Sequence, residues 1–388
     1  MTIDNSGLEA IRARINQVDD QLKKLILERL EIVSDVAAYK KAAGLPVTDR
    51  EREKKVIARL TQGEVADTSL YLKMFYSNIF NLSKLKESAD MSADDPSGLV
   101  RRFLDACSTP RVFPERPVVG CQGIKGANSG LAAEKLFVEP DIRYYESFGD
   151  VLDAVDRGEV RYGVIPIENS IAGSVSGIYE MIAEHGDYIV RALKLRITHA
   201  LLASPGTALK DIGKVYSHPQ ALSQCSRFLK ECLPDAEIVP CSNTAVAAEK
   251  AAENGNGCAA ICSPACIGLY RLDRVTGAPD VISDVGDNYT RFVVVSPELE
   301  IYPGSDKITV TAELPDRPGA LYELISEFAA ADINLTKIES RPIPCRQFEY
   351  SFIFDFEMSP VQIYTNAVLN DILTRYKARF LGAYCETE

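Results

Sequence analysis

The first 90 residues carry apolar side chains at the spacing of one helix face. From Leu8 to Val36 an apolar residue recurs every three or four positions, as on the buried side of an α-helix. Ser6–Glu9 has the form of a capping box, and Gly44 and Pro46 follow the last apolar positions. This helix should be about 50 Å long. A helix of that length cannot bury its apolar stripe alone in a small domain, so it needs partners.

Two further helices are predicted in the same segment. Thr48–Glu51 has the form of a second capping box, and a third helix is predicted from Asp67 to Glu87. Three helices with one oversized member predict an all-α domain that forms an intertwined dimer.

From Val118 the pattern changes to alternating strands and helices. A strand at Val118–Gly120 runs into a glycine-rich turn and then a helix that ends near Phe137. A helix is predicted over Phe148–Arg157 and a buried strand over Tyr162–Ile167. Similar units continue to about residue 261. The pattern predicts two α/β lobes with a cleft between them.

The last segment has the order βαββαβ. Lys307–Leu314 alternates as a strand, Ala320–Ala330 has a helical pattern, and the aromatic residues of Phe348–Phe356 repeat at every second position. A second helix is predicted over Val361–Lys377 and a last strand near Phe380. This order indicates an α+β, ferredoxin-like unit. One face of its sheet needs cover, which suggests pairing between subunits.

Length and composition limit the number of domains and the kinds of partner that the protein can have. The chain has 388 residues and a net charge of −12, which predicts two or three domains and argues against nucleic acid as a partner. An anionic substrate should therefore be gathered by local cations. No apolar run approaches the roughly 18 residues that cross a bilayer, and the first residues lack the core of a signal peptide. We expect a cytoplasmic protein without a membrane partner.

The cysteines and histidines suggest no metal. Ten cysteines are scattered over a long chain, which favours reduced thiols over a disulfide scaffold. Pro264 interrupts any helix that would align Cys258, Cys262 and Cys266, and three histidines make no convincing zinc set. We expect neither a metal nor a cofactor.

Domain boundaries follow from these changes of pattern. The stretch Ser88–Gly98 is polar, acidic and rich in turn residues, as in a flexible linker. We expect a helical domain over 1–90, a linker over 91–116, the two-lobed domain over 117–297 and the last domain over 305–388. The second lobe should span about 194–274.

The run Asn288–Phe292 carries the most specific chemistry. It joins the hydroxyl of Thr290 to the permanent cation of Arg291 and to the ring of Phe292, a set that suits a small, cyclic, acidic substrate. Taken alone, the run is also typical of a strand edge. Two other stretches accompany it, Gly163–Ser170 and Glu339–Pro342.

Charged residues also share helix faces in the first segment. Arg29 and Lys40 are eleven positions apart, which is about 20° around a helix. Each charge taken alone is more often solvated than functional. Together with the rest of residues 8–88, the pattern resembles the all-helical chorismate mutases. By that resemblance Arg12 and Arg29 bind the substrate carboxylates, Arg12 in the partner subunit's site, and Lys40 contacts the ether oxygen. The remaining implied site residues are Asp49, Arg52, Glu53, Ser83 and Glu87, the last replacing a glutamine of many relatives.

Residues 117–296 resemble prephenate dehydratases, with lobes of the periplasmic-binding-protein type II arrangement. The resemblance rests on Gly163–Ser170, Ser217–Gln220, Asn243–Ala245 and Asn288–Phe292. It implies that Thr290 assists departure of the ring hydroxyl and that Arg291 holds a carboxylate. His218 is either an acid or a structural hydrogen-bonding residue. The full implied set is Glu168, Asn169, Ser170, His218, Gln220, Asn288, Thr290, Arg291 and Phe292.

The last segment resembles phenylalanine-sensing ACT domains. The residues that would cradle phenylalanine at a dimer interface are Gly319, Ala320, Leu321, Glu339, Ser340, Arg341 and Pro342. The whole chain thus resembles the bifunctional chorismate mutase–prephenate dehydratases, which implies chorismate and prephenate as substrates, phenylalanine as effector and a homo-oligomer, dimer or tetramer. Two alternatives stay open on the same fold. One is a non-catalytic sensor of an amino or keto acid, and the other is an enzyme that retains a single activity.

Overall fold

The computed structural model describes the chain apart from residues 1–5, 92–97, 110, 344–345, 347–348 and 359–361. The chain divides into two compact units. One unit combines Met1–Arg102 with Thr311–Arg379, and the other combines Phe103–Val310 with Phe380–Glu388. The described strands form sheets of seven, five and four strands.

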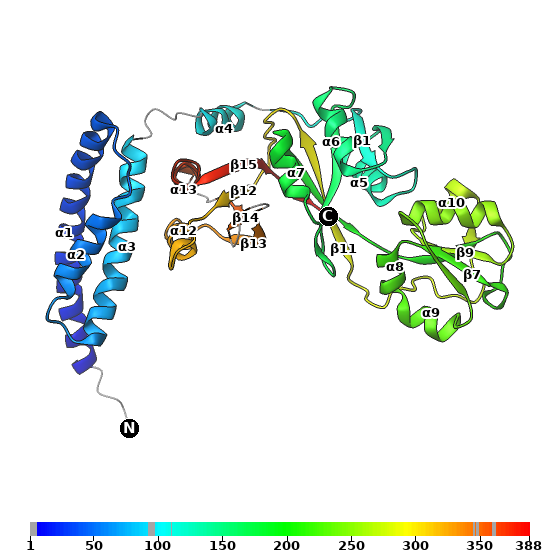
Figure 1. The fold of residues 1–388 in the computed structure, drawn as a ribbon, viewed down its shortest axis with the longest axis horizontal. Coiled ribbons are helices and arrows are strands. Elements are labelled where there is room, and N and C mark those ends of the chain that lie inside the picture. The colour runs from blue at the N-terminus through cyan, green and yellow to red at the C-terminus, as the bar shows by residue number, and fades with distance from the viewer. Residues whose placement is uncertain (1–5, 92–97, 110, 344–345, 347–348, 359–361) are drawn as a thin grey trace. The chain divides into compact units, whose positions relative to one another are not determined.

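The three helices predicted for the first segment are confirmed. They are α1 (Ser6–Ala43), α2 (Arg50–Thr61) and α3 (Ala66–Met91), and both α1 and α2 pack on α3 (Figure 1). Gly44 ends α1 with a positive φ of 64°. The N-cap of the second helix was predicted at Thr48, one residue before its observed position. Asp49, not Thr48, accepts the backbone N–H of Arg52 at 3.0 Å, and its carboxylate suits the positive end of the helix.

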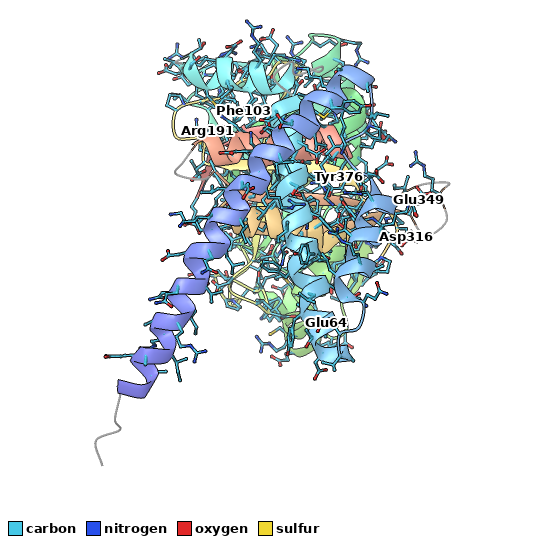
Figure 2. All side chains as sticks on the ribbon, turned by 90° about the vertical axis from the view of Figure 1, so that its left-hand side faces the viewer. Glu64, Phe103, Arg191, Asp316, Glu349 and Tyr376 are labelled. Atoms are coloured by element: carbon cyan, nitrogen blue, oxygen red, sulfur yellow. The ribbon has the colours of Figure 1, made fainter. Side chains whose placement is uncertain are left out.

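The helical segment buries few of its own apolar side chains. Only Val33, Ala37 and Phe80 are buried hydrophobic residues among the described positions of α1–α3. The first turns of α1 project with side chains on every side (Figure 2). Exposed apolar residues follow α1 for most of its length: Leu8, Ile11, Ile15, Val18, Leu22, Leu25, Leu27, Ile32 and Val36.

The last segment has the predicted ferredoxin-like order. Its strands are β12 (Lys307–Glu313), β13 (Leu335–Pro342), β14 (Tyr350–Glu357) and β15 (Lys377–Tyr384), arranged β13-β14-β12-β15. The helices are α12 (Ala320–Ala330) and α13 (Gln362–Arg375). Phe328, Phe354 and Phe356 form its aromatic core, with ring centroids 4.9–6.1 Å from Phe328. Phe348 and Val361, at the predicted element starts, lie outside the described residues.

The other unit contains two lobes, each built on its own sheet (Figure 1). After α4 (Leu99–Ser108), the first sheet has the order β16-β5-β11-β3-β1-β2, with β4 on β3. Its strands are β1 (Val118–Gln122), β2 (Asp141–Tyr145), β3 (Tyr162–Asn169), β4 (Gly173–Ser174), β5 (Tyr188–Arg196), β11 (Tyr289–Ser296) and β16 (Glu386–Thr387). The helices are α5 (Asn128–Leu136), α6 (Phe148–Asp156) and α7 (Ile178–His185). Participation of β16 was not anticipated, because residues 305–388 were expected to belong to the last domain.

The second lobe is a five-stranded sheet in the order β10-β6-β9-β7-β8. Its strands are β6 (Ala200–Ala203), β7 (Lys214–Ser217), β8 (Glu237–Pro240), β9 (Cys258–Cys262) and β10 (Asp273–Arg274). Its helices are η1 (Leu209–Asp211), α8 (Pro219–Gln224), α9 (Ser226–Cys232), α10 (Thr244–Asn254) and α11 (Cys266–Tyr270). The chain passes between the lobes twice, after β5 and before β11, and the N–H of Ile197 donates to the carbonyl of Asn288 at 2.8 Å where the crossings meet.

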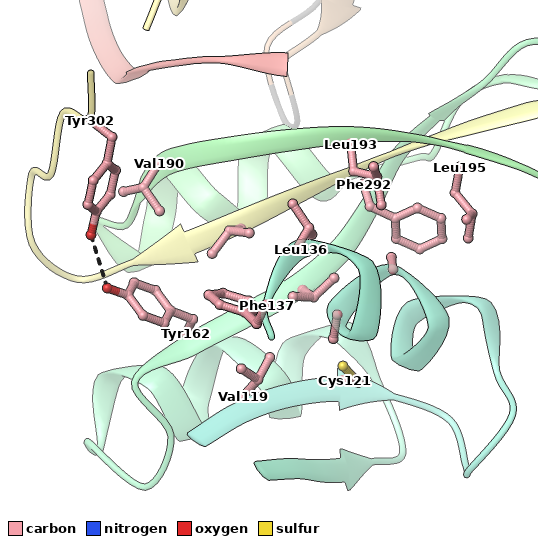
Figure 3. Close-up of a cluster of buried hydrophobic side chains, with 14 of the residues drawn as sticks. Val119, Cys121, Leu136, Phe137, Tyr162, Val190, Leu193, Leu195, Phe292 and Tyr302 are labelled. Atoms are coloured by element: carbon pink, nitrogen blue, oxygen red, sulfur yellow. Dashed lines mark hydrogen bonds between the residues drawn. The ribbon is translucent and has the colours of Figure 1, made fainter. Parts of the chain in front are cut away.

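The core of the first lobe reaches from its helices to β11. Phe292 lies beside Leu193 and Leu195 in this cluster (Figure 3). The hydroxyl groups of Tyr162 and Tyr302 lie 3.2 Å apart at its other end (Figure 3). Because β11 is antiparallel to both β3 and β5, it lies inside the sheet and is held on both edges. Side chains at the start of β11 therefore stand on a rigid support where the lobes join.

Candidate functional site

A cavity of about 470 Å³ lies where the two lobes join. Its walls come from β3 and β11, from the crossing segments, and from the starts of α5, α6, α8 and α10. Its lining includes the side chains of Asn169, His199, His218, Gln220, Gln224, Asn288, Thr290 and Phe292. This volume is in the range of small-molecule sites.

Thr290 faces the cavity with its oxygen held by an amide. Asn169 Nδ2 lies 3.0 Å from Thr290 Oγ1, 2.7 Å from Asn288 Oδ1 and 3.1 Å from the carbonyl of Tyr289, and its two hydrogens are shared among these three oxygens. Asn169 Oδ1 accepts the backbone N–H groups of Ile171 and Ala172 at 3.1 and 3.0 Å, which fixes the amide orientation. Because Thr290 Oγ1 accepts from Asn169, its own hydrogen can be donated to a group in the cavity.

The amide network continues from Asn288 to two residues that sequence reasoning missed. Asn288 Nδ2 donates to Gln224 Oε1 at 3.0 Å, and His199 Nε2 lies 3.0 Å from the same oxygen. Since Gln224 Oε1 is an acceptor, His199 must carry its hydrogen on Nε2. Burial lowers the pKa of His199, so this ring is neutral at pH 7. Gln224 could have been found, because it follows Gln220 by four positions on one helix face.

His218 has a structural role that the sequence left open. It is the N-cap of α8, and its Nδ1 accepts the backbone N–H of Gln220 at 3.2 Å. Burial lowers the pKa of His218, so the neutral ring carries its hydrogen on Nε2. His218 and Gln220 both line the cavity. The imidazole therefore caps a helix and presents one N–H donor.

Arg291 does not line the cavity, in contrast to the expectation that it clamps a substrate carboxylate. Side chains alternate along a strand, so Thr290 and Phe292 share one face and Arg291 takes the other. Arg291 is only 8% exposed, and its Nε lies 2.5 Å from Glu386 Oε1. Its guanidinium also donates to the hydroxyl of Tyr384 at 2.8 Å.

Glu168 and Ser170 are likewise absent from the cavity lining. A Glu168 oxygen lies 3.8 Å from Arg291 Nη1, on the far face of the sheet. Ser170 Oγ accepts the backbone N–H of Tyr289 at 2.9 Å and so ties β3 to the start of β11. Of the expected group Glu168–Ser170, only Asn169 reaches the cavity.

The described lining of the cavity contains no lysine or arginine, so the local cations expected to gather an anionic substrate are not found in it. The helix starts at Ala127–Ser129 and Ser242–Thr244 line it instead. These are the first turns of α5 and α10, whose backbone N–H groups attract anions. Gly123 permits their approach: a side-chain carbon there would lie 3.1 Å from Ala127 and 3.3 Å from Asn243.

In the helical segment, expected site residues of α1 contact expected site residues of α3. Arg29 donates to Ser83 Oγ, and Lys40 Nζ contacts Glu87 Oε2 and the carbonyl of Val47, both at 2.6 Å. Burial lowers the pKa of Arg29, although Tyr76 and Glu87 act in the opposite direction. Arginine nevertheless stays charged at any working pH. Two cations of α1 thus meet acceptors of α3.

Lys84 of α3 is a buried cation that was not expected in the site. It is 4% exposed, and its Nζ lies 3.4 Å from Glu53 and 3.8 Å from Glu323 on α12. No pattern in the sequence distinguishes it from a solvated lysine. Sequence reasoning placed Glu53 in the site but missed the cation beside it.

Three expected residues of the helical segment stand apart from this cluster. Asp49 caps α2, and Arg52 and Arg12 are exposed. Arg12 precedes Arg29 by 17 positions on one helix, which is about 25 Å. One chain therefore cannot bring both guanidinium groups to one small ligand.

In the last segment the two expected groups lie on different elements. Gly319 has a φ of +86° and begins α12, followed by Ala320 and Leu321. Glu339–Pro342 are the final residues of β13, where Glu339 pairs with Arg341 at 2.6 Å and with Lys337 at 3.2 Å. Ser340 and Pro342 are exposed.

The described residues offer neither a membrane span nor a metal site. No helix is long and apolar enough to cross a membrane. No cluster of three or more His, Cys, Asp or Glu side chains could hold a metal ion in the described part of the chain.

Comparison with known families divides the chain into three matches. The chorismate mutase type II family matches residues 11–88, the prephenate dehydratase family residues 119–300, and the ACT domain family residues 308–361. Each match covers a segment described above: α1–α3, the two lobes, and most of the ferredoxin-like unit.

Individual relatives show the same order. A bifunctional chorismate mutase/prephenate dehydratase of Pseudomonas aeruginosa is 31% identical over 393 residues, 98% of either chain. A chloroplastic arogenate dehydratase/prephenate dehydratase of Arabidopsis thaliana is 38% identical and covers 69% of this chain and 72% of its own. The solved prephenate dehydratase of Arthrobacter aurescens, in complex with L-Phe, is 32% identical with a TM-score of 0.62, and covers 69% of this chain and 89% of its own.

Proposed function

The chain belongs to the bifunctional chorismate mutase/prephenate dehydratase family, and we propose which of its side chains act in each reaction. The helical segment rearranges chorismate to prephenate, and the two lobes convert prephenate to phenylpyruvate. Phenylalanine regulates the enzyme through the ACT domain. A non-catalytic sensor is not favoured, because both segments match enzyme families over most of their length.

The mutase reaction requires a rigid binding site lined by charged side chains. The rearrangement needs no nucleophile, so catalysis comes from holding a strained conformer and stabilising charge as the ether bond breaks. Arg29 and Ser83 bind a substrate carboxylate, and Lys40 donates to the ether oxygen. Asp49 and Glu53 hold the ring hydroxyl, and Arg52 supports the pocket. The cluster of Arg29, Ser83, Lys40 and Glu87 supports this assignment.

The mutase site requires a second chain. Arg12 lies too far along α1 to join Arg29, and apolar side chains on both sides of it are exposed. Exposed apolar surface on this scale is typical of a subunit interface. The enzyme is a homo-oligomer, dimer or tetramer, in which Arg12 of the partner subunit completes the binding site. Light scattering of the full chain tests this, and a monomer with full mutase activity would contradict it.

In the dehydratase reaction the ring carboxylate leaves as carbon dioxide. Its electron pair makes the ring aromatic, and the ring hydroxyl leaves as hydroxide. Thr290 donates a hydrogen bond to the departing oxygen and keeps its own proton, while Asn169 holds Thr290 Oγ1 in place. The first turns of α5 and α10 hold the carboxylates in a cavity without lysine or arginine in its described lining. The observation that carries this assignment is the 3.0 Å contact between Asn169 and Thr290.

Replacement of Thr290 tests the assignment. Thr290→Val removes the hydroxyl and keeps the shape of the side chain, and Thr290→Ser keeps the hydroxyl. We expect the valine variant to lose about a hundredfold or more in kcat for phenylpyruvate formation from prephenate. The serine variant should keep most of the activity, and mutase activity should stay parental in both. A valine variant with parental kcat would remove Thr290 from the mechanism.

Phenylalanine binding is assigned to Gly319–Leu321 and Glu339–Pro342, with the two groups supplied across a subunit interface. The ferredoxin-like order of the segment and the L-Phe complex of a relative support this. Inhibition requires that phenylalanine bind two states of the enzyme with different affinity. We also propose a cytoplasmic location, because every cysteine that the structure describes is free.

A further inference from the structure

We propose that Glu386 is a positioning residue for the dehydratase reaction: it holds Arg291, and through Arg291 the part of β11 that carries Thr290. The proposal rests on the role given to Thr290 above. Glu386 lies on β16, almost 100 residues after Thr290 in the chain, and β16 pairs in parallel with β5. None of the matched families includes this residue within its range.

Glu386 is the only described carboxylate shared by three cations on this face of the sheet. Its oxygens lie 2.5 Å from Arg291 Nε, 3.0 Å from Lys194 Nζ and 2.9 Å from Lys307 Nζ. Burial raises the pKa of Glu386, but Arg291 and both lysines together lower it to about 2. The side chain is therefore a carboxylate at every working pH.

The strand register explains why this carboxylate is needed. Arg291 and Lys194 are direct cross-strand neighbours on β11 and β5. Like charges at such a pair push strands apart. Glu386 contacts both cations and offsets that repulsion. On the other edge of β11, Glu168 lies opposite Arg291, so a carboxylate stands on either side of the two neighbouring cations across four adjacent strands.

The ladder beside Thr290 is irregular, which makes side-chain contacts more important there. Glu168 and Pro166 pair with the adjacent residues Arg291 and Phe292, so Ile167 is an extra residue and β3 bulges. A bulge changes the direction of neighbouring side chains. Thr290 is therefore fixed by Asn169 on the cavity face and by the Arg291–Glu386 pair on the opposite face. Loss of Glu386 should misdirect the hydroxyl without removing any group that touches the substrate.

The test compares Glu386→Gln and Glu386→Asp in the full chain, with Glu388→Gln as the matched control. Glu388 is an exposed carboxylate two residues further on. For Glu386→Gln we expect kcat with prephenate to fall about ten- to a hundredfold while KM stays within about threefold, because a small misplacement of a reacting group affects the chemical step. Glu386→Asp should recover part of kcat. Glu388→Gln should be parental, and mutase activity should be unchanged in all three.

A double variant tests whether Glu386 acts through Arg291. Arg291→Gln should lower kcat, and adding Glu386→Gln should lower it no further. A parental kcat in Glu386→Gln, a rise in KM without loss of kcat, or a parallel loss of mutase activity would overturn the proposal. Thr290→Val distinguishes failure of the role given to Thr290 from failure of the role given to Glu386. If it stays active, the role of Thr290 fails and the proposal falls with it; if it is inactive while Glu386→Gln is parental, the proposal alone falls.

Discussion

The substitution Asn169→Asp tests the hydrogen bond from Asn169 Nδ2 to Thr290 Oγ1, which orients the hydroxyl of Thr290. It replaces one NH2 group by oxygen and leaves the shape of the side chain almost unchanged. The remaining oxygen still accepts from Ile171 and Ala172, so the turn after β3 should persist. The three contacts of Asn169 Nδ2, at 2.7–3.1 Å, are lost.

The size of the effect follows from where the hydroxyl hydrogen of Thr290 goes. With a carboxylate at position 169, Thr290 donates to it instead of to the substrate. A hydrogen bond to a charged group is worth about 1.5–3 kcal/mol, and it must be broken before Thr290 can serve the departing hydroxide. Each 1.4 kcal/mol is about tenfold in rate, so kcat should fall about ten- to a hundredfold. The added negative charge should also raise KM for an anionic substrate.

The assay is steady-state formation of phenylpyruvate from prephenate, with mutase activity measured on the same preparation. Asn254→Asp, the same exchange on the exposed end of α10, controls for the change of charge. A kcat within about threefold of the parent would show that the hydroxyl of Thr290 does not assist the departing hydroxide. The new hydrogen bond from Thr290 to the carboxylate should lower kcat at least about tenfold.

Three other predictions address the remaining sites. Glu87→Gln should raise mutase kcat/KM at pH 7.5, because glutamine donates to the ether oxygen while a carboxylate pairs with Lys40 at 2.6 Å; a decrease in chorismate turnover would contradict this. Lys84→Met removes the cation beside Glu53, while Glu323 keeps Arg317 and Arg375, and it should lower the free energy of unfolding by about 1.5–3 kcal/mol, measured with urea; a loss below about 1 kcal/mol would refute it. His199 has a pKa lowered by burial from its ordinary 6.5, so the stability it confers is present above pH 6.5 and lost as pH falls below it. The unfolding free energy of the parent minus that of His199→Gln should therefore shrink by up to about 1.4 kcal/mol per pH unit below pH 6.5, and a constant difference would contradict this.

The elements with strong periodicity were predictable from the sequence. Ala320–Ala330 is predicted and observed as a helix with the same bounds, and the three long helices of the first segment are present. Apolar spacing reports directly on which side chains are buried, and it needs no knowledge of distant contacts. The cap at Asp49 was missed because Thr48 and Asp49 are both good caps and only the backbone geometry selects one.

The direction of Arg291 was not predictable, because it depends on a strand nearly 100 residues away. Alternation alone would have placed Arg291 and Thr290 on opposite faces. Which face is the cavity depends on the pairing of β11 with β3 and β5, and the partner of Arg291 depends on β16. Long-range pairing of this kind leaves no local signal. The absence of Arg291 from the described cavity lining follows from the same alternation.

The measurement that tests the central claim most directly is phenylpyruvate formation from chorismate and, separately, from prephenate, each with and without phenylalanine. The account predicts product from both substrates and suppression of both by phenylalanine. Product from prephenate alone would contradict the assignment of the helical segment. No product from either substrate would contradict the enzyme assignment as a whole.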